Sequence, residues 1–173
     1  MTIKTERLIL EPISQKHFLS THCFASDPAN TRFMMYLPFA DTEETQEFIT
    51  EAAEEIKKEK PSYYEMAVMY GGVHIGTVSL YLSEDRTSSE VGWIMDRQYQ
   101  GQGFASEAAS ALIRYAADVL GIHHFSAHCD TENTASRRVM EKLGMELKSE
   151  HGGRKNRLSD EERREYLFEL DLF

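Results

Sequence analysis

From Glu90 to Ala108 the chain reads EVGWIMDRQYQGQGFASEA. The apolar run predicts a strand over Glu90 to Met95, followed by a turn with two glycines two residues apart and then by a helix. Because Gly101 and Gly103 carry no Cβ atom, a ligand can approach the backbone closely there. The N–H groups of Gln102 to Ala105 open the helix and have no intrahelical partner, so they can bind an anion such as a pyrophosphate.

Three other interpretations of this turn compete with an anion site. A Walker phosphate loop needs Gly-Lys-Ser/Thr after its glycines, whereas the chain reads Gly103-Phe104-Ala105. A dinucleotide fingerprint needs a third glycine where Ser106 stands, early in a βαβ unit. A plain tight turn onto a helix stays open, since two glycines at this spacing do not exclude it.

The periodicity of apolar residues predicts the other elements. Strands are expected over Leu8–Ile13, Tyr63–Tyr70, Val73–Leu82, about seven residues that end near Asp130, Met145–Glu150 and Tyr166–Leu170. Helices are expected over His17–Ser26, after the capping residue Asp41, from Ala105 to the C-cap Gly121, and over Asn133–Leu143. Gly71-Gly72 predicts a primed turn that joins two strands into a hairpin. This order of elements predicts an α/β fold with a mixed sheet and helices on its faces.

The chain has 173 residues, of which 41% are hydrophobic and 28% charged, as is typical of one globular domain over 1–173 and not of a disordered chain. No apolar run approaches the roughly 18 residues of a membrane span, and the first residues lack the apolar core of a signal peptide. We therefore expect a cytoplasmic protein with no membrane partner. Two cysteines, Cys23 and Cys129, are too few for a disulfide scaffold and are expected to be packed thiols.

The formal net charge is −10, from 19 basic and 29 acidic residues. Such a chain repels phosphate backbones and acidic membranes, so nucleic acid is not expected as a partner. A cationic acceptor would be attracted, although acidity also serves solubility.

The cluster of His123, His124, His128, Cys129 and Asp130 suggests a metal site. On a strand that rises about 3.3 Å per residue, His124 and His128 share a face but lie roughly 13 Å apart, which is too far for one ion. No metal is expected.

Three separated motifs resemble the GNAT family of N-acetyltransferases, and within it the RimJ/RimL-type branch. Gln98-x-x-Gly101-x-Gly103 is similar to the cofactor signature of the family, in the strand-turn-helix context that the signature needs. Thr5 to Leu10 is similar to the opening strand of the branch, and the segment from Asn133 to Met145 is similar to its closing helix. The resemblance covers nearly the whole chain. It implies a mostly antiparallel sheet in which two parallel strands splay to form an acyl-CoA cleft, with acetyl-CoA as the co-substrate.

The resemblance implies that the cofactor contacts Trp93, Ile94, Met95, Gln98, Gly101, Gln102, Gly103, Phe104, Ala105, Asn133 and Arg138. The N–H groups of the turn would hold the pyrophosphate, and the strand Trp93 to Met95 would pair with the pantetheine amides. A strand N–H close to Ile94 or Met95 would meet the thioester carbonyl oxygen. Asn133 would steady the pantetheine arm and cap its helix, and Arg138 would either reach the ribose phosphate, together with Arg137, or stay on the surface.

Acetyl transfer to an amine needs a base, because an alkyl amine with a pKa of about 10.4 is protonated at neutral pH. Glu90 is the first candidate, because the family often places a carboxylate on this strand, and Glu65 on the predicted hairpin is the second. Ser136 occupies the position that RimL-like members use to protonate the leaving thiolate, and Tyr166 is the alternative.

The resemblance implies direct transfer to a primary amine in a ternary complex. The acceptor is either a protein N-terminus, as in the RimJ/RimL-type branch, or a small amine such as a polyamine, an amino acid or an aminoglycoside. A homodimer is among the states that the resemblance implies. A non-catalytic acyl-CoA-binding module is the competing class. The basic cluster from Arg154 to Arg157 is expected to lie in an exposed loop.

Overall fold

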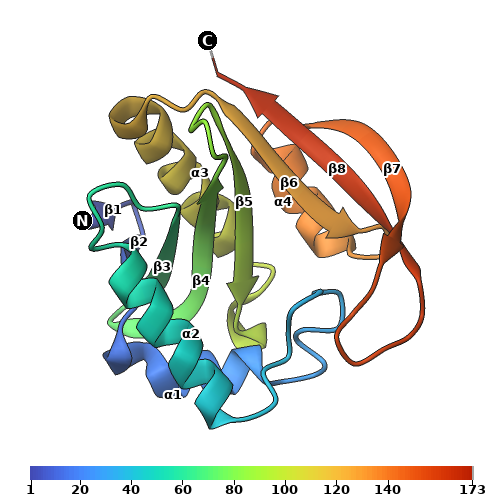
Figure 1. Cartoon of the computed structure of the whole chain (residues 1–173), viewed down its shortest axis with the longest axis horizontal. Coiled ribbons are helices and arrows are strands. Elements are labelled where there is room, and N and C mark those ends of the chain that lie inside the picture. Colours follow the sequence, from blue (N-terminus) through green and yellow to red (C-terminus); the bar gives the residue numbers. More distant parts are fainter. Residues whose placement is uncertain (173) are drawn as a thin grey trace.

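One eight-stranded sheet, with the order β1-β2-β3-β4-β5-β6-β8-β7, forms the centre of the computed structural model, which describes residues 1–172 (Figure 1). The strands are β1 Ile3–Lys4, β2 Leu8–Pro12, β3 Tyr63–Tyr70, β4 Val73–Leu82, β5 Ser88–Met95, β6 His124–Asp130, β7 Glu146–Arg154 and β8 Arg163–Asp171. Neighbouring strands are antiparallel except for β5 and β6, which are parallel. The mixed, mostly antiparallel α/β fold is therefore confirmed.

Helices cover both faces of the sheet (Figure 1). They are α1 Phe18–Ala25, α2 Thr42–Glu55, α3 Phe104–Tyr115 and α4 Thr134–Lys142. The larger hydrophobic cluster packs α3 and α4 against the strands, with Leu112, Met140 and Phe125 fully buried. A smaller cluster of Ile13 and two α2 residues lies on the other face, beneath α1 and α2. Alternate residues of the central strands thus contribute to different layers.

Two local structures form as the sequence predicts, a helix cap and a turn. Asp41 caps α2, where its carboxylate accepts a hydrogen bond from the N–H of Glu44 at 2.9 Å. Gly71 and Gly72 have positive φ angles of 56° and 83°, which the primed turn between β3 and β4 requires.

The contact between β4 and β5 requires a glycine at position 76. A Cβ atom on Gly76 would overlap the carbonyl oxygen of Ile94 and lie 2.7 Å from Met95 Sδ. The close approach fixes the end of β5, from which the glycine turn starts.

The structure differs from the prediction in one helix and in the last two strands. The helix that starts after the glycine turn changes to a π-helix over Ala116–Leu120 before Gly121, whose φ of 71° ends it as expected. The last two strands are longer than predicted, because β7 continues to Arg154 and β8 begins at Arg163. The predicted strand ends at Glu150, but pairing with β8 continues past Gly152 and Gly153 with shifts in register.

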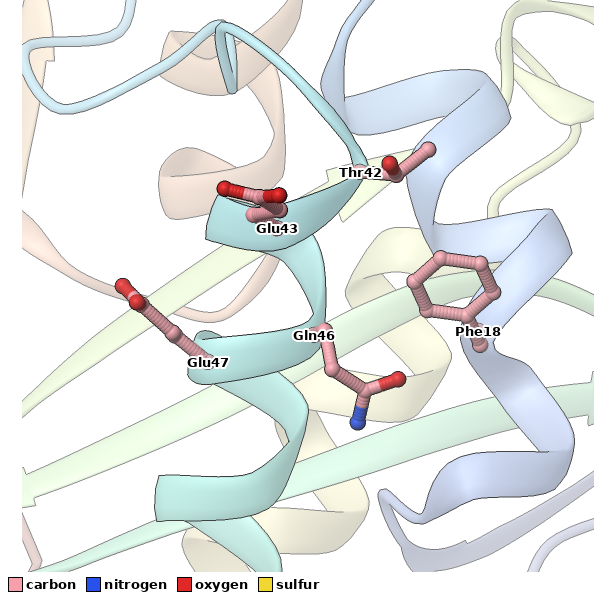
Figure 2. A pocket seen from close by; sticks show the side chains of 5 residues that line it. All are labelled: Phe18, Thr42, Glu43, Gln46 and Glu47. Carbon is pink, nitrogen blue, oxygen red and sulfur yellow. The ribbon is translucent and has the colours of Figure 1, made fainter.

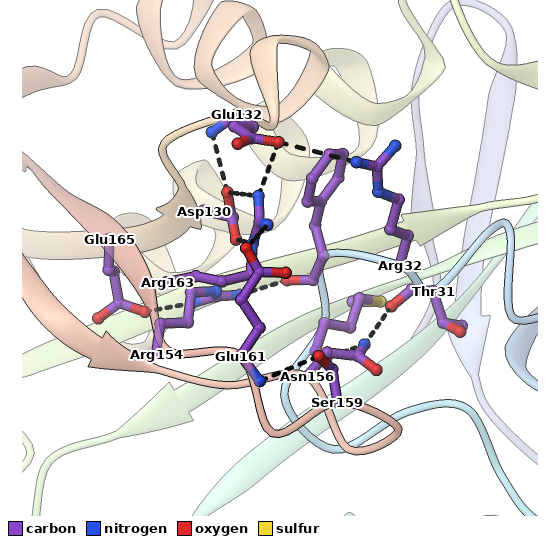
Figure 3. A network of polar contacts seen from close by, with 12 residues as sticks. Thr31, Arg32, Asp130, Glu132, Arg154, Asn156, Ser159, Glu161, Arg163 and Glu165 are labelled. Carbon is purple, nitrogen blue, oxygen red and sulfur yellow. Dashed lines mark hydrogen bonds and ion pairs between the residues drawn. The ribbon is translucent and has the colours of Figure 1, made fainter.

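The expectation that Arg154 to Arg157 form an exposed loop holds for Lys155 and Arg157 but not for Arg154, which ends β7, or for the half-buried Asn156. Arg154 and Asn156 contact the segment that precedes α2 (Figure 3). Arg154, with a side chain only 10% exposed, pairs with Glu165 and donates to the Phe33 carbonyl at 2.8 Å. Asn156 donates to the carbonyls of Thr31 and Met34. Arg157 pairs with Glu44 at 2.6 Å and lowers the pKa of that carboxyl to about 2. Loop carbonyls outside regular structure need such donors.

No helix within residues 1–172 combines the length and the apolar character that crossing a membrane requires.

Candidate active site

The two parallel strands part after only three residue pairs. Ser88–Glu90 of β5 pair with His124–Ser126 of β6, and beyond this point β5 keeps β4 as its partner on one side only. The two strands visibly diverge toward their C-terminal ends (Figure 1). The splay that the family resemblance implies is therefore present, and residues 91–95 of β5 have an edge that no other strand covers.

The hydrogen-bond pattern of β5 decides which backbone groups point to this open edge. The N–H of Asp96 donates to the carbonyl of Ile75 at 2.8 Å, which continues the antiparallel ladder with β4. Because the direction of the backbone groups alternates along a strand, Ile94 also points toward β4, whereas Val91 and Trp93 point toward the open edge. Trp93 is thus well placed for backbone pairing, and the N–H of Ile94, which we expected near the thioester carbonyl, is directed away from it.

Met95 closes the open edge. Its carbonyl accepts hydrogen bonds from Asn30 Nδ2 and Gln100 Nε2, both at 3.1 Å, and its side chain is buried. The Met95 carbonyl therefore already accepts two hydrogen bonds, which the sequence did not predict. A pantetheine amide would compete with these two donors.

The glycine turn follows directly. Asp96 caps a short 3-10 turn over Arg97–Tyr99, and Gly101 and Gly103 have φ angles of 75° and 82°. Between Gly101 and Ala105, no backbone N–H group finds a hydrogen-bond acceptor within the described residues. Five N–H groups at the start of α3 are therefore unpaired, and unpaired donors at a helix N-terminus suit a pyrophosphate. Gln98 lies in the 3-10 turn, where its carbonyl accepts a hydrogen bond from the Gln102 side chain at 3.2 Å.

Arg7 is a residue that the sequence did not single out. Its guanidinium stacks 4.5 Å above the Phe104 ring, donates to the Gln102 carbonyl at 3.0 Å and pairs with Glu107 at 2.6 Å. A cation is thereby placed next to the donors of the turn. Arg7 lies about a hundred residues from the turn in sequence, and no local pattern links them.

The candidate base Glu90 lies where the strands part, and its side chain is 50% exposed. Its Oε1 is 3.0 Å from Nδ1 of His128 on β6. The hydrogen bond that His128 donates to Glu90 raises the pKa of His128, against the opposing effect of burial. The sequence suggested His128 only as a metal ligand and gave no reason to pair it with Glu90.

The second candidate base, Glu65, is almost completely buried in the middle of β3. Ser79 donates a hydrogen bond to its carboxyl at 2.6 Å, and the Tyr81 hydroxyl donates another. Burial raises the pKa of Glu65 to about 7. Both donors are on β4, so another strand separates Glu65 from β5.

The start of α4 brings Asn133 and Ser136 together. The Asn133 side chain accepts a hydrogen bond from the Ser136 N–H at 3.1 Å, so its capping role is confirmed. The Ser136 hydroxyl is half-buried and makes no hydrogen bond within residues 1–172. Arg137 pairs with Glu141 at 2.9 Å and lies over the Tyr166 ring, whereas the exposed Arg138 forms no ion pair with any described residue.

The two β6 histidines of the suggested metal cluster have separate hydrogen-bond partners. His124 contacts Asp171 at 2.7 Å, and His128 contacts Glu90. Across the described part of the chain, no three His, Cys, Asp or Glu side chains gather as metal ligands. Burial raises the pKa of Cys129 to about 11, whereas Cys23 is exposed, so the expectation of two packed thiols holds for one of them.

Two cavities lie near the α1 side of the sheet. One of about 460 Å³ adjoins the glycine turn and is lined by Cys23, Phe24, Asp27, Asn30, Asp96, Arg97 and Gln98. Another of about 440 Å³ lies between α1 and α2 and is lined by Phe18, Thr42, Glu43, Gln46 and Glu47 (Figure 2). Neither is lined by Glu90 or Ser136.

Comparison with known proteins relates this arrangement to acetyltransferases. A family model described as an acetyltransferase (GNAT) domain matches residues 7–146. The protein YnaD of Bacillus subtilis, named as an uncharacterized N-acetyltransferase, is 29% identical over 148 residues, which cover 84% of this chain and 82% of YnaD.

Solved structures show the same fold. An acetyltransferase of the GNAT family from Bacillus anthracis is 26% identical, with a TM-score of 0.83 over 99% of this chain and 98% of that chain. RimL, a ribosomal L7/L12 alpha-N-protein acetyltransferase solved with coenzyme A, reaches a TM-score of 0.85 over 99% of this chain and 98% of its own, at 17% identity. The likeness to RimL concerns the fold alone.

Proposed function

Because this chain belongs to the GNAT family of acetyltransferases, we propose that it transfers acetyl from acetyl-CoA to a primary amine, which is either a protein N-terminus or a small molecule. Acetyl-CoA-dependent N-acetylation is the activity of the chain, as its N-acetyltransferase relatives indicate. None of these relatives favours a non-catalytic acyl-CoA-binding module. The identity of the acceptor and the roles of single residues are the proposed part.

One observation supports the binding mode above all: the unpaired N–H groups of Gly101 to Ala105 follow the open edge of β5 after one short turn. A diphosphate held by these donors would leave its pantetheine arm next to the free backbone groups of Trp93. Arg7 would add a positive charge beside the diphosphate. Arg138, exposed on α4, would reach the ribose phosphate.

The chemistry then needs two proton transfers. The acceptor must lose a proton before its nitrogen attacks the thioester carbon, and Glu90 lies at the parting of the strands on the face of α1 and α2. The thiolate leaves on the other side and takes a proton from a donor, for which Ser136 at the start of α4 offers a hydroxyl without a partner among the described residues. The carbonyl oxygen would be stabilised by a β5 N–H that points to the open edge.

The acceptor class follows from charge and from the relatives. The net charge of −10 attracts a cationic amine. RimL, which shares the fold, is named for acetylating the α-amino group of a ribosomal protein. Protein N-termini and small polycationic amines are therefore the acceptors to compare first.

The experiment is an acceptor screen that measures CoA release from acetyl-CoA with N-terminal peptides, polyamines, amino acids and aminoglycosides. We expect at least one amine to stimulate release, and Ser136→Ala to lower kcat roughly 10- to 100-fold with unchanged acetyl-CoA affinity. Ser159→Ala, which removes an exposed hydroxyl in the β7–β8 loop, is the control. An enzyme that binds acetyl-CoA but is stimulated by no amine would contradict the proposed function.

A further inference from the structure

The point where β5 and β6 part carries a histidine as well as Glu90. Glu90 and Ser126 form the last residue pair between these strands, and His128 follows two residues later on β6. Because side chains alternate along a strand, His128 lies on the same face of the sheet as Ser126 and Glu90. The next β5 residue on this face is Gly92, where an added Cβ would meet only Ser79 Cβ at 3.9 Å. Open space therefore adjoins the pair.

The hydrogen bond between the two side chains fixes how the imidazole is oriented. His128 Nδ1 lies 3.0 Å from Glu90 Oε1. An ionised carboxylate can only accept, so Nδ1 must carry the proton, and the lone pair of the neutral ring is on Nε2. Nε2 has no hydrogen-bond partner within residues 1–172, and the side chain is 27% exposed. The ring is thus held by one nitrogen and can accept a proton on the other.

The length of the open edge of β5 places the thioester of bound acetyl-CoA close to Glu90 and His128. From Glu90 to Met95 the strand rises about 17 Å, which is comparable with the reach of an extended pantetheine arm. An arm that starts at the N–H groups of the glycine turn and runs along the open edge therefore ends beside Glu90 and His128. The acceptor nitrogen must meet the thioester at this place.

We propose that His128 Nε2 is the general base that deprotonates the acceptor amine, and that Glu90 is a positioning residue that holds the imidazole by Nδ1. This inference rests on the proposed acetyl transfer and changes the role of Glu90 within it.

The protons and bonds balance as follows. Nε2 of His128 takes one proton from the acceptor ammonium, and the lone pair of the neutral amine forms the C–N bond with the thioester carbon. The C–S bond breaks, and its electron pair leaves with sulfur, which is protonated by Ser136 or by water. The amide nitrogen loses its second proton, which restores the Ser136 hydroxyl or the water, and His128 releases its proton to solvent before the next cycle. The sum is one amide, one CoA thiol and one proton per ammonium and thioester.

Charged groups on three other strands change the pKa of His128. Glu90 on β5 and Glu165 on β8 favour its protonated form, and Arg154 on β7 opposes it. The pKa of His128 is raised on balance, first by the hydrogen bond that the ring donates to Glu90. The neutral base should therefore appear as the pH rises above the ordinary titration range of histidine.

The test is the pH dependence of kcat/KM for the best amine of the screen, at saturating acetyl-CoA. The wild type should gain activity with a titration above pH 6.5, the ordinary value for histidine. His128→Gln should lose this titration and roughly 100-fold or more in rate. Glu90→Gln should keep the titration but move it to lower pH, because His128 loses the carboxylate that raises its pKa. Acetyl-CoA affinity, measured by calorimetry, should stay unchanged in both variants.

A matched control is His124→Gln, which removes another β6 histidine that is hydrogen-bonded to a carboxylate, on the same face but at the closed end of the strand pair. It should leave the pH profile unchanged. The inference is overturned if His128→Gln keeps the rate and the titration of the wild type, or if Glu90→Gln alone abolishes the titration, which would make Glu90 the base. Absence of amine-stimulated CoA release in the wild type would instead contradict the proposed function, and the base with it.

Discussion

Glu65 is a carboxyl group placed where an ionised carboxylate is costly. It is 3% exposed, and burial raises its pKa from 4.5 to about 7, although the Ser79 and Tyr81 hydroxyls donate hydrogen bonds to it. A folded-state pKa above the unfolded value means that the folded state binds the proton more tightly. The stability that this proton contributes is complete below pH 4.5 and is lost as the pH rises through 7.

Glu65→Gln should therefore change the pH dependence of stability. The amide cannot ionise, so the variant is not destabilised at high pH, whereas the wild type must then hold a buried carboxylate charge. Between pH 4 and pH 8, the difference in unfolding free energy should shift in favour of the variant by roughly 3 kcal/mol. Urea unfolding at a series of pH values measures this difference.

The control for Glu65 is Glu6→Gln, since Glu6 is exposed and has no ion pair with any described residue. This substitution should change the unfolding free energy by no more than about 0.5 kcal/mol, because it alters a side chain on the surface. If the difference in unfolding free energy between Glu65→Gln and the wild type were independent of pH, the pKa of the buried carboxyl would not be raised.

At the scale of elements, α3 carries a left-handed glycine at each end of its helical segment. Gly103 precedes it with a φ of 82°, and Gly121 ends the π-helical continuation with a φ of 71°. An added Cβ would meet nothing closer than 3.5 Å at Gly103 and nothing within 4 Å at Gly121. The two positions thus share a left-handed backbone and free space, but only Gly103 adjoins the unpaired N–H groups.

Substitution by alanine should separate the contribution of each glycine to stability from its contribution to acetyl-CoA binding. Each variant should lose about 1 to 2 kcal/mol of stability, because a Cβ disfavours left-handed backbone. Gly103→Ala should also weaken acetyl-CoA binding by tenfold or more, since relaxation of the strain turns N–H groups away from the diphosphate. Calorimetric titration with acetyl-CoA and thermal unfolding measure the two effects. Equal acetyl-CoA affinities in the Gly103 and Gly121 variants would contradict a diphosphate site at this turn.

Elements whose signal is local could be predicted from the sequence. The Asp41 cap, the Gly71-Gly72 turn and the strand-turn-helix around Gly101 depend on neighbouring residues, and all three are present. The pairing of His128 with Glu90 depends on two strands that meet 38 residues apart, and Arg7 reaches the turn from farther still. Such contacts follow from strand order and register, which periodicity does not encode. The exposed interpretation failed at Arg154 and Asn156 for the same reason.

At the scale of the whole molecule, the segment before α2 bridges the open ends of the two parting strands. Asn30 donates to the Met95 carbonyl at the end of β5. Two residues later, Arg32 lies 3.7 Å from Glu132, just beyond β6, and Arg154 of β7 donates to Phe33. The β7–β8 loop is fastened to the same segment (Figure 3). The width of the opening is therefore set by contacts between four separate parts of the chain.

Asn156 is the residue to test in this bridge. Its side-chain amide donates to the carbonyls of Thr31 at 2.9 Å and Met34 at 2.7 Å. Asn156→Ala leaves both carbonyls without these donors, so stability should fall by about 1 to 3 kcal/mol. The amide protons of residues 31–37 should exchange faster with solvent, because the segment loses the contacts that order it. Hydrogen exchange read by mass spectrometry measures this, together with urea unfolding.

The KM for the amine should also rise in Asn156→Ala, while the acetyl-CoA affinity stays close to that of the wild type. The glycine turn that binds the diphosphate belongs to β5 and α3, which keep their own ladder and core contacts. The segment from Asn30 to Phe33 instead spans the mouth between the strands, through which we expect the acceptor to approach the thioester. Ser159→Ala in the same loop, whose hydroxyl only accepts from the Glu161 N–H, should change neither exchange nor KM. If residues 31–37 kept their protection in Asn156→Ala, other contacts would have to order the bridge, and the β7–β8 loop would have no part in setting the opening.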